Sequence, residues 1–188
     1  MSTLGAVLAG GRSSRMGTDK ADVEVEGQTM LQRVSSALEE VLPHVVVLGA
    51  ERKGIECWPD VVPARGPLAG IATALSRMED DRVVIVAVDQ PFVRTATLVE
   101  LTEFDSRIPV VPVDDVGVRQ VTCAVYPKAI ADAAIEEAEA DGSIQSLLDR
   151  VSFEAVIPEI WVLWGEDGRS WFSVDTHAAL EEGIRRFL

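Results

Sequence analysis

The chain has 188 residues, and its 31 acidic residues against 17 Lys and Arg give a formal net charge of −14. This balance argues against nucleic-acid binding, because contacts with phosphates need a dense basic face, and against docking on an anionic membrane. The length and a hydrophobic fraction of 47% predict a single globular domain over residues 1–188. The longest apolar stretch in mid-chain, Val83–Val88, is too short to span a bilayer, and the N-terminus has no basic leader. We therefore expect a cytoplasmic protein whose cysteines, Cys57 and Cys123, stay reduced.

Short apolar runs alternate with amphipathic segments through the first half of the chain. The apolar runs predict strands, and the segments with apolar residues three to four positions apart predict helices. The expected strands are 4–9, 44–49, 82–88 and 108–113, and the expected helices are 28–42, 66–78 and 95–104. This order predicts an α/β protein with a mostly parallel sheet and right-handed crossovers.

The second half is less regular. Residues 118–126 predict a strand, paired antiparallel with its predecessor across the turn at 114–117. The helical segments there are 128–140, 144–151 and 176–188, and the last of them is expected to turn Leu180, Ile184, Phe187 and Leu188 inward. The segments 153–157 and 160–164 are strand-like, since both are short and rich in β-branched and aromatic residues.

The most informative stretch is LAGGRSSRMGTDKA, residues 8–21, which directly follows the first predicted strand. In an open parallel sheet the ligand crevice lies at the carboxyl ends of the strands, where this loop falls. The loop combines three glycines with three cations, namely Gly10, Gly11, Gly17, Arg12, Arg15 and Lys20. Backbone amides and fixed cations suit a polyphosphate. The spacing matches neither the P-loop nor the dinucleotide-binding fingerprint.

The string LAGGRSSRMGTDK strongly resembles the N-terminal signature of nucleotidyltransferases, and among these the molybdenum cofactor guanylyltransferase family. The resemblance continues in order through GPLAGI (66–71), VAVDQPFV (86–93), QVTCAVYPKA (120–129) and SVDTHAAL (173–180). It implies a Rossmann-like, three-layer α/β/α fold. It also implies Mg²⁺-dependent transfer of GMP from GTP to the terminal phosphate of molybdopterin, with release of pyrophosphate. Transient contact with other molybdenum cofactor proteins is part of the same expectation.

The resemblance also implies roles for individual residues. The expected catalytic residues are Arg15, Lys20 and Asp89. The expected nucleotide-binding residues are Leu8, Ala9, Gly10, Gly11, Arg12, Lys20, Asp60, Pro67, Gly70 and Asp89. The expected metal ligands are Asp89 and Asp175.

Asp89 follows a buried strand and precedes Pro91, as in the metal-binding C-D-x-P motif of the family, with Val88 at the position of the usual cysteine. A carboxylate there points into the crevice, where hard oxygen donors hold Mg²⁺ together with phosphates. The alternative for Asp89 is a helix cap, a role for which Thr95 is better placed. Asp175 lies in an element resembling N-x-N-T or D-x-D-T, and either it or Thr176 alternatively caps the last helix.

The base is suggested by Gly10, where related cytidylyltransferases usually carry alanine, because a missing methyl leaves room for a purine. Asp19 also matches the guanine-type pattern. Against this, VVVLGA at 45–50 replaces an asparagine-containing stretch of the family and removes a possible contact with the nucleotide. The alternatives are a cytidylyltransferase acting on the same or another phosphorylated acceptor, and a non-catalytic nucleotide-binding regulatory module. Asp60 is either a nucleotide contact or part of an exposed turn.

The acceptor site is weakly marked in the sequence. Gln120, Thr122 and Cys123 match family segments near the sheet edge, and Arg119 either meets the anionic acceptor or is an exposed residue of an edge strand. Trp161 and Trp164 fall on opposite faces of the predicted strand, so they form no joint stacking platform, and we expect them to pack in the core or at an edge.

Overall fold

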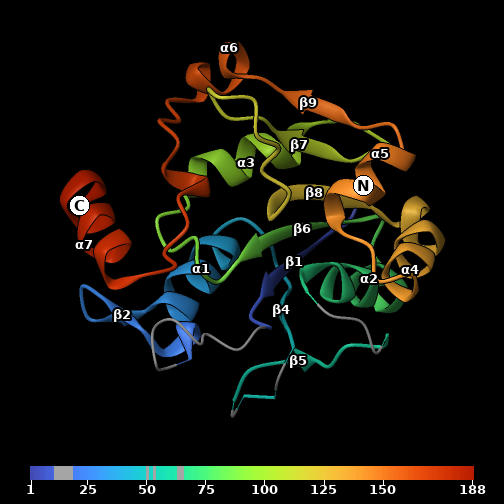
Figure 1. Cartoon of the computed structure of the whole chain (residues 1–188), viewed down its shortest axis with the longest axis horizontal. Helices are drawn as coiled ribbons and strands as arrows, with labels where there is room; N and C mark the ends of the chain where they lie inside the picture. The colour runs from blue at the N-terminus through green and yellow to red at the C-terminus, as the bar shows by residue number, and fades with distance from the viewer. Residues whose placement is uncertain (11–18, 50, 53, 63–65) are drawn as a thin grey trace.

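The computed structural model describes residues 1–10, 19–49, 51–52, 54–62 and 66–188, and its centre is a seven-stranded sheet (Figure 1). The sheet has the order β5-β4-β1-β6-β8-β7-β9. Its strands are β1 (Thr3–Leu8), β4 (Val45–Leu48), β5 (Cys57–Trp58), β6 (Arg82–Ala87), β7 (Val110–Pro112), β8 (Cys123–Pro127) and β9 (Glu154–Val156). All of them run in one direction except β8, which is antiparallel to both β6 and β7.

Helices cover both faces of the sheet. The main helices are α1 (Met30–Glu39), α2 (Pro67–Arg77), α3 (Thr95–Glu103), α4 (Ala131–Glu139), α5 (Ile144–Arg150), α6 (Pro158–Trp161) and α7 (His177–Phe187). Helices α2, α4 and α5 share one core cluster, and α1, α3, α6 and α7 share the other. In Figure 1 the first group lies to the right of the sheet, with α7 on the far left. The expected three-layer α/β/α architecture is therefore confirmed.

The sequence pattern explains the two cores. Along β6 all residues are buried, with Val83 and Ile85 in the cluster of α2 and Val84 and Val86 in the cluster of α1. A continuous β-branched run is typical of a strand that is covered on both faces. Helix α1 begins at residue 30 because Thr29 and Gln32 form a capping box, in which each side chain accepts a bond from the other residue's backbone N–H.

Small elements complete the described residues. They are the hairpin β2 (Glu24–Val25) and β3 (Gln28–Thr29) and the 3₁₀ helices η1 (Lys20–Asp22), η2 (Lys128–Ile130), η3 (Val162–Trp164) and η4 (Arg169–Trp171). Neither this hairpin nor β5 is predicted from the sequence, because two-residue strands carry no periodicity. No helix in the described ranges is both long and apolar enough to cross a bilayer.

Three predictions about the second half are wrong in detail. Residues 160–164 are helical, because Pro158 begins α6 and the N–H of Trp161 bonds to the carbonyl of Ile157. The strand expected from residue 118 begins only at Cys123, since Asp114 Oδ1 accepts the N–H groups of Val116 and Val118 and lengthens the turn. Leu188 is 62% exposed rather than inward. The antiparallel pairing across that turn is confirmed.

Candidate active site

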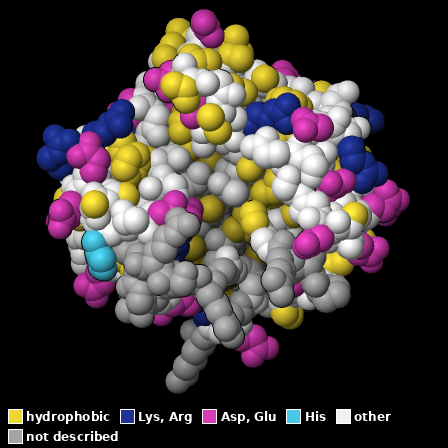
Figure 2. Space-filling model, viewed as in Figure 1, with side chains coloured by type: hydrophobic (Ala, Val, Ile, Leu, Met, Phe, Trp, Pro, Cys, Tyr) yellow, Lys and Arg dark blue, Asp and Glu magenta, His cyan; other side chains and the backbone are white. Residues whose placement is uncertain are grey.

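A cleft of about 340 Å³ lies at the edge of the sheet where β1 and β6 end. Its lining consists of Leu8, Ala9, Gly10, Asp19, Lys20, Pro67, Ala87, Val88, Asp89, Gln90, Gln120, Thr122, Trp171 and Ser173. Figure 2 shows the face that bears the cleft, with acidic side chains scattered around the outer rim and hydrophobic side chains toward the centre. On this face the acidic side chains therefore lie mainly at the periphery.

The strand order explains the position of the cleft. The chain runs from β1 outward to β4 and β5 and then returns to β6 on the opposite side of β1, so the connections diverge between β1 and β6. Such a switch point is the usual ligand crevice of an α/β sheet. Because β8 is antiparallel, its beginning reaches the same edge, where the carbonyl of Thr122 accepts the N–H of Ala87 at 2.8 Å. Residues that are far apart in the sequence therefore meet in one cleft.

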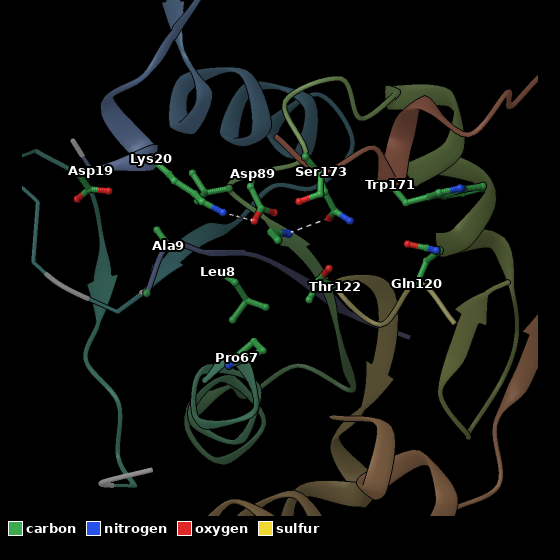
Figure 3. A pocket seen from close by; sticks show the side chains of 14 residues that line it. Leu8, Ala9, Asp19, Lys20, Pro67, Asp89, Gln120, Thr122, Trp171 and Ser173 are labelled. Carbon is green, nitrogen blue, oxygen red and sulfur yellow. Dashed lines mark hydrogen bonds and ion pairs between the residues drawn. The ribbon is translucent and has the colours of Figure 1, made fainter. Parts of the chain in front are cut away.

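Lys20 lies at the centre of the charged groups in the cleft. Its Nζ donates to Asp89 Oδ2 at 2.9 Å, drawn as a dashed line in Figure 3, and also to Asp175 Oδ1. Asp89 follows β6, and Asp175 precedes α7. The backbone joins these two segments as well, because the N–H of Val174 donates to the carbonyl of Asp89 at 2.7 Å. Lys20, Asp89 and Asp175 were all predicted as site residues, and the structure brings them together.

The surroundings of Lys20 raise the pKa of its ammonium. Burial by itself lowers this pKa, but the hydrogen bonds to Asp175 and Asp89 and the charges of both carboxylates outweigh the burial. Lys20 is therefore a cation at neutral pH. Among the described residues, one positive and two negative side chains of the site are thus in direct contact.

The alternative roles of the two carboxylates as helix caps are not what the structure shows. The hydroxyl of Thr176 accepts the N–H of Ala179 and caps α7, while Asp175 bonds to Lys20 and accepts the hydroxyl of Ser173 at 3.2 Å. Helix α3 begins after Arg94, with no side-chain cap among the described residues. Thr95, expected to be the better cap, instead donates its hydroxyl to Glu40.

The other predicted nucleotide-binding residues divide into three groups. Leu8, Ala9, Gly10 and Pro67 line the cleft beside Lys20 and Asp89. Gly70 lies behind the lining, where a Cβ atom would come within 2.6 Å of Leu8 Cδ2, so its small size lets α2 approach β1. Gly11, Arg12 and Arg15 lie outside the described residues.

Asp60 follows β5 and is not among the described residues that line the cleft. Desolvation nevertheless raises the pKa of its carboxyl. Its predicted contact with the nucleotide stays a prediction.

Helix α2 begins at the cleft with Pro67 in its first turn, preceded by Gly66. The first N–H groups of a helix have no partner within the helix, and they give its N-terminus a partial positive charge. This end of the cleft is therefore suited to an anionic group even though the chain as a whole is acidic.

Gln90 and Trp171 line the cleft although no role was predicted for them from the sequence. Gln90 is buried, and its Oε1 accepts the N–H of Ala87 at 3.2 Å. Trp171 packs edge-on against Trp161, with ring centroids 5.4 Å apart. Only their positions in the sequence could have indicated a place in the site. Gln90 lies between the motif residues Asp89 and Pro91, and Trp171 lies two residues before SVDT. In Figure 3, Trp171 and Gln120 lie across the cleft from Lys20 and Asp19.

The remaining acceptor candidates are not in the lining. Arg119 bonds to Asp149 at 2.6 Å and lies over the ring of Phe153. Cys123 is fully buried, and burial raises the pKa of its thiol far above the usual range. Trp161 and Trp164 pack in the hydrophobic cluster that contains α1 and α3. The expected packing role is therefore confirmed, although their segment is helical.

The chain is similar to known proteins over most of its length. The family model of the MobA-like NTP transferase domain matches residues 5–156. A probable molybdenum cofactor guanylyltransferase of Natronomonas pharaonis is 34% identical over 97% of this chain and 96% of the relative. Another from Clostridium perfringens is 27% identical over 96% of each chain.

Solved structures show the same fold. Molybdopterin-guanine dinucleotide biosynthesis protein A from Archaeoglobus fulgidus superposes with a TM-score of 0.83 at 24% identity over 97% of both chains. The 2-C-methyl-D-erythritol 4-phosphate cytidylyltransferase of Thermus thermophilus gives a TM-score of 0.70 at 16% identity over 98% of both. The fold is thus shared by nucleotidyltransferases with different bases and acceptors. With the family model covering most of its length and a full-length relative at 34% identity, the chain belongs to the MobA-like NTP transferase family.

Proposed function

We propose that this protein transfers GMP from GTP to the phosphate of molybdopterin, forming molybdopterin guanine dinucleotide and releasing pyrophosphate. The observation that carries the proposal is the contact of Lys20 with Asp89 and Asp175, in a cleft bordered by the start of the glycine-rich segment. The names of the full-length relatives support the base and the acceptor. A cytoplasmic location and contacts with other molybdenum cofactor proteins stay predictions.

The nucleotide fits the end of the cleft formed by Leu8, Ala9, Gly10 and Pro67. There the N-terminus of α2 and the ammonium of Lys20 offer positive charge to a triphosphate. Arg12 and Arg15 are proposed from the sequence to add further charge. Since the net charge of −14 repels a nucleotide at long range, these local groups carry the binding.

Magnesium fits the donor set of the cleft. Mg²⁺ is commonly held by one or two carboxylates together with substrate phosphates, and Asp89 and Asp175 supply two carboxylates that already share one cation, Lys20. No group of three or more His, Cys, Asp or Glu side chains that could hold a metal occurs in the described part of the chain. Substrate phosphates and water would supply further ligands. Bound there, the metal would neutralise charge on the triphosphate.

The chemistry needs no covalent enzyme intermediate. A phosphate oxygen of the acceptor attacks the α-phosphorus of GTP in line, a new P–O bond forms, and the bond to the β-phosphate breaks. Lys20 neutralises charge that develops on the phosphates and on the departing pyrophosphate. The acceptor phosphate is already an anion at neutral pH, so a general base is unnecessary.

The acceptor fits the opposite end of the cleft. Gln120 and Thr122 offer polar side chains there, and Trp171 adds an aromatic wall (Figure 3). A pterin is planar and carries several hydrogen-bonding groups, which this combination of side chains suits.

Release of pyrophosphate tests the proposal. The protein is supplied with purified molybdopterin, Mg²⁺ and each of the four nucleoside triphosphates in turn. We expect pyrophosphate with GTP and formation of the guanine dinucleotide. A preference for CTP would assign a cytidylyltransferase, and binding of GTP without pyrophosphate release would indicate the non-catalytic module.

A further inference from the structure

The ion pairs of Lys20 use the same oxygen donors that a divalent cation needs. Its ammonium contacts Asp89 Oδ2 and Asp175 Oδ1 together. Carboxylates engaged with an ammonium are poorer metal ligands, because the bound cation repels a second one. The side chains of Lys20 and Asp89 are 21% and 23% exposed and that of Asp175 is 50% exposed, so solvent screens the repulsion incompletely at Asp89 and more fully at Asp175.

We propose that Lys20 makes metal binding conditional on the nucleotide: its ammonium blocks Asp89 and Asp175 until a triphosphate takes the ammonium up. The order of events rests on the function proposed above, whereas the competition for the carboxylates rests on the ion pairs alone. Binding of the triphosphate to Lys20 then removes the ammonium from both carboxylates as the metal arrives with the phosphates. The ammonium and the metal thereby exchange partners instead of sharing the same two carboxylates.

The backbone of Lys20 is anchored while its side chain is long. Lys20 begins η1, where Asp19 Oδ1 accepts the N–H of Ala21 at 3.0 Å. Arg52 in turn bonds to Asp19 Oδ2 at 2.6 Å and reaches Asp22 at 3.4 Å. A lysine ammonium on a flexible four-carbon stem can change partner without moving such a backbone. The exchange therefore needs only rotations within one side chain.

The charge of Lys20 persists through the exchange. Before the exchange its ammonium contacts two carboxylates. A triphosphate offers the ammonium equivalent anionic partners. Lys20 is thus a positioning group for the phosphates and, before they bind, a competitor of the metal.

A purely structural role for Lys20 makes the opposite prediction. If the ammonium only holds the two carboxylates in the geometry that the metal needs, its removal weakens metal binding. If the ammonium competes with the metal, its removal strengthens metal binding in the absence of nucleotide. The sign of one measurement therefore separates the two roles.

Manganese alone is the probe, followed by electron paramagnetic resonance of the free ion in titrations without nucleotide. The variants are Lys20→Met and a matched control, Arg107→Met, which removes a cation from an exposed position away from the cleft. We expect Lys20→Met to bind Mn²⁺ about tenfold more tightly than the unchanged protein, and Arg107→Met to match it. Thermal unfolding checks that each variant folds.

A second comparison tests whether the gain in Mn²⁺ affinity arises at the carboxylates. Asp89→Asn in the Lys20→Met background is expected to abolish most of the gain. Equal or weaker Mn²⁺ binding by folded Lys20→Met would overturn the proposal, and so would a gain that survives Asp89→Asn. Neither result depends on turnover. If the unchanged protein releases no pyrophosphate but Lys20→Met gains Mn²⁺ affinity, the proposed function fails and the competition stands.

Discussion

Gly49 lies against the backbone of Gly10, so that a Cβ atom on Gly49 would come within 3.1 Å of both the N and the Cα of Gly10. Gly49 has a φ of +122°, a conformation that residues with side chains rarely adopt. The end of β4 therefore supports the start of the glycine-rich segment directly. The preceding residue, Leu48, belongs to the core, so neither residue offers a side-chain contact in place of the family's asparagine.

Gly10 itself is expected to bias the choice of base. A Cβ atom there meets no atom of the described residues within 4 Å, so Gly10→Ala is expected to fold normally and to place a methyl group at the cleft. We expect kcat/KM for GTP to fall about tenfold and that for CTP to change less, because one methyl in a pocket is worth about 1–3 kcal/mol. The two triphosphates serve as each other's control. An equal fall in kcat/KM with both triphosphates would show that Gly10 does not influence the choice of base.

Thr122 tests the acceptor end of the cleft. Thr122→Val keeps the shape of the side chain but removes its hydroxyl. We expect the KM for molybdopterin to rise roughly 2- to 10-fold, the range of one hydrogen bond, with the KM for GTP unchanged. Steady-state pyrophosphate release at varied acceptor measures the effect. The control is Thr102→Val, whose hydroxyl bonds within α3 outside the cleft lining. A higher KM for GTP alone would place Thr122 at the nucleotide end instead.

Gly183 tests the packing that holds the segment after Asp89. A Cβ atom on Gly183 would overlap the ring of Phe92 and lie 3.1 Å from Phe172. Overpacking of this kind costs about 1–3 kcal/mol, whereas alanine in place of glycine gains about 1 kcal/mol of helix propensity. We expect Gly183→Ala to lower the free energy of unfolding measured with urea. The control is the exposed residue Glu181 in the same helix, where Glu181→Ala is expected to have a higher free energy of unfolding than Glu181→Gly. A stabilised Gly183→Ala would show that Phe92 moves aside without cost.

Glu137 gives the stability a dependence on pH. Its hydrogen bond to Arg150 at 2.7 Å, with a second one to Ser146, lowers the pKa of its carboxyl below the ordinary 4.5. A carboxyl with a lowered pKa in the folded state contributes stability above its unfolded pKa and loses it as the pH falls through the folded value. Glu137→Gln is therefore expected to destabilise the protein at neutral pH, and the deficit is expected to shrink below pH 4.5. Urea titrations measure it, with exposed Glu139→Gln as the control. A deficit independent of pH would contradict the ionic role.

Most elements of the first half of the fold could be predicted from the sequence, because the hydrophobic periodicity and the length of each segment indicate the same type of element there. β6 is a β-branched run buried on both sides, and α1 carries an amphipathic pattern with a capping box. Both signals are local. The error at 160–164 has a different origin, since a short apolar run reads alike as strand or helix and the packing of Trp161 on Trp171 is a tertiary contact.

The candidate site was predicted only where a motif marks it. Lys20, Asp89 and Asp175 stand in family-like strings, and the structure joins them. Trp171 was not predicted, because the sequence near the end of the chain does not indicate that this aromatic residue packs beside the ends of β1 and β6. Gly70 was assigned to the nucleotide from a string, but its contact with Leu8 depends on how closely α2 packs on the sheet.

The rate of pyrophosphate release by Asp89→Asn tests the central claim most directly. The substitution keeps the size of the side chain but removes the charge that meets Lys20. With GTP, molybdopterin and Mg²⁺, we expect the rate to fall by about 10²–10³, as when one electrostatic contact to a transition state is lost. Asp132→Asn, at an exposed position of α4, is expected to keep the full rate. Full turnover by folded Asp89→Asn would contradict the assignment of this cleft as the site of nucleotidyl transfer.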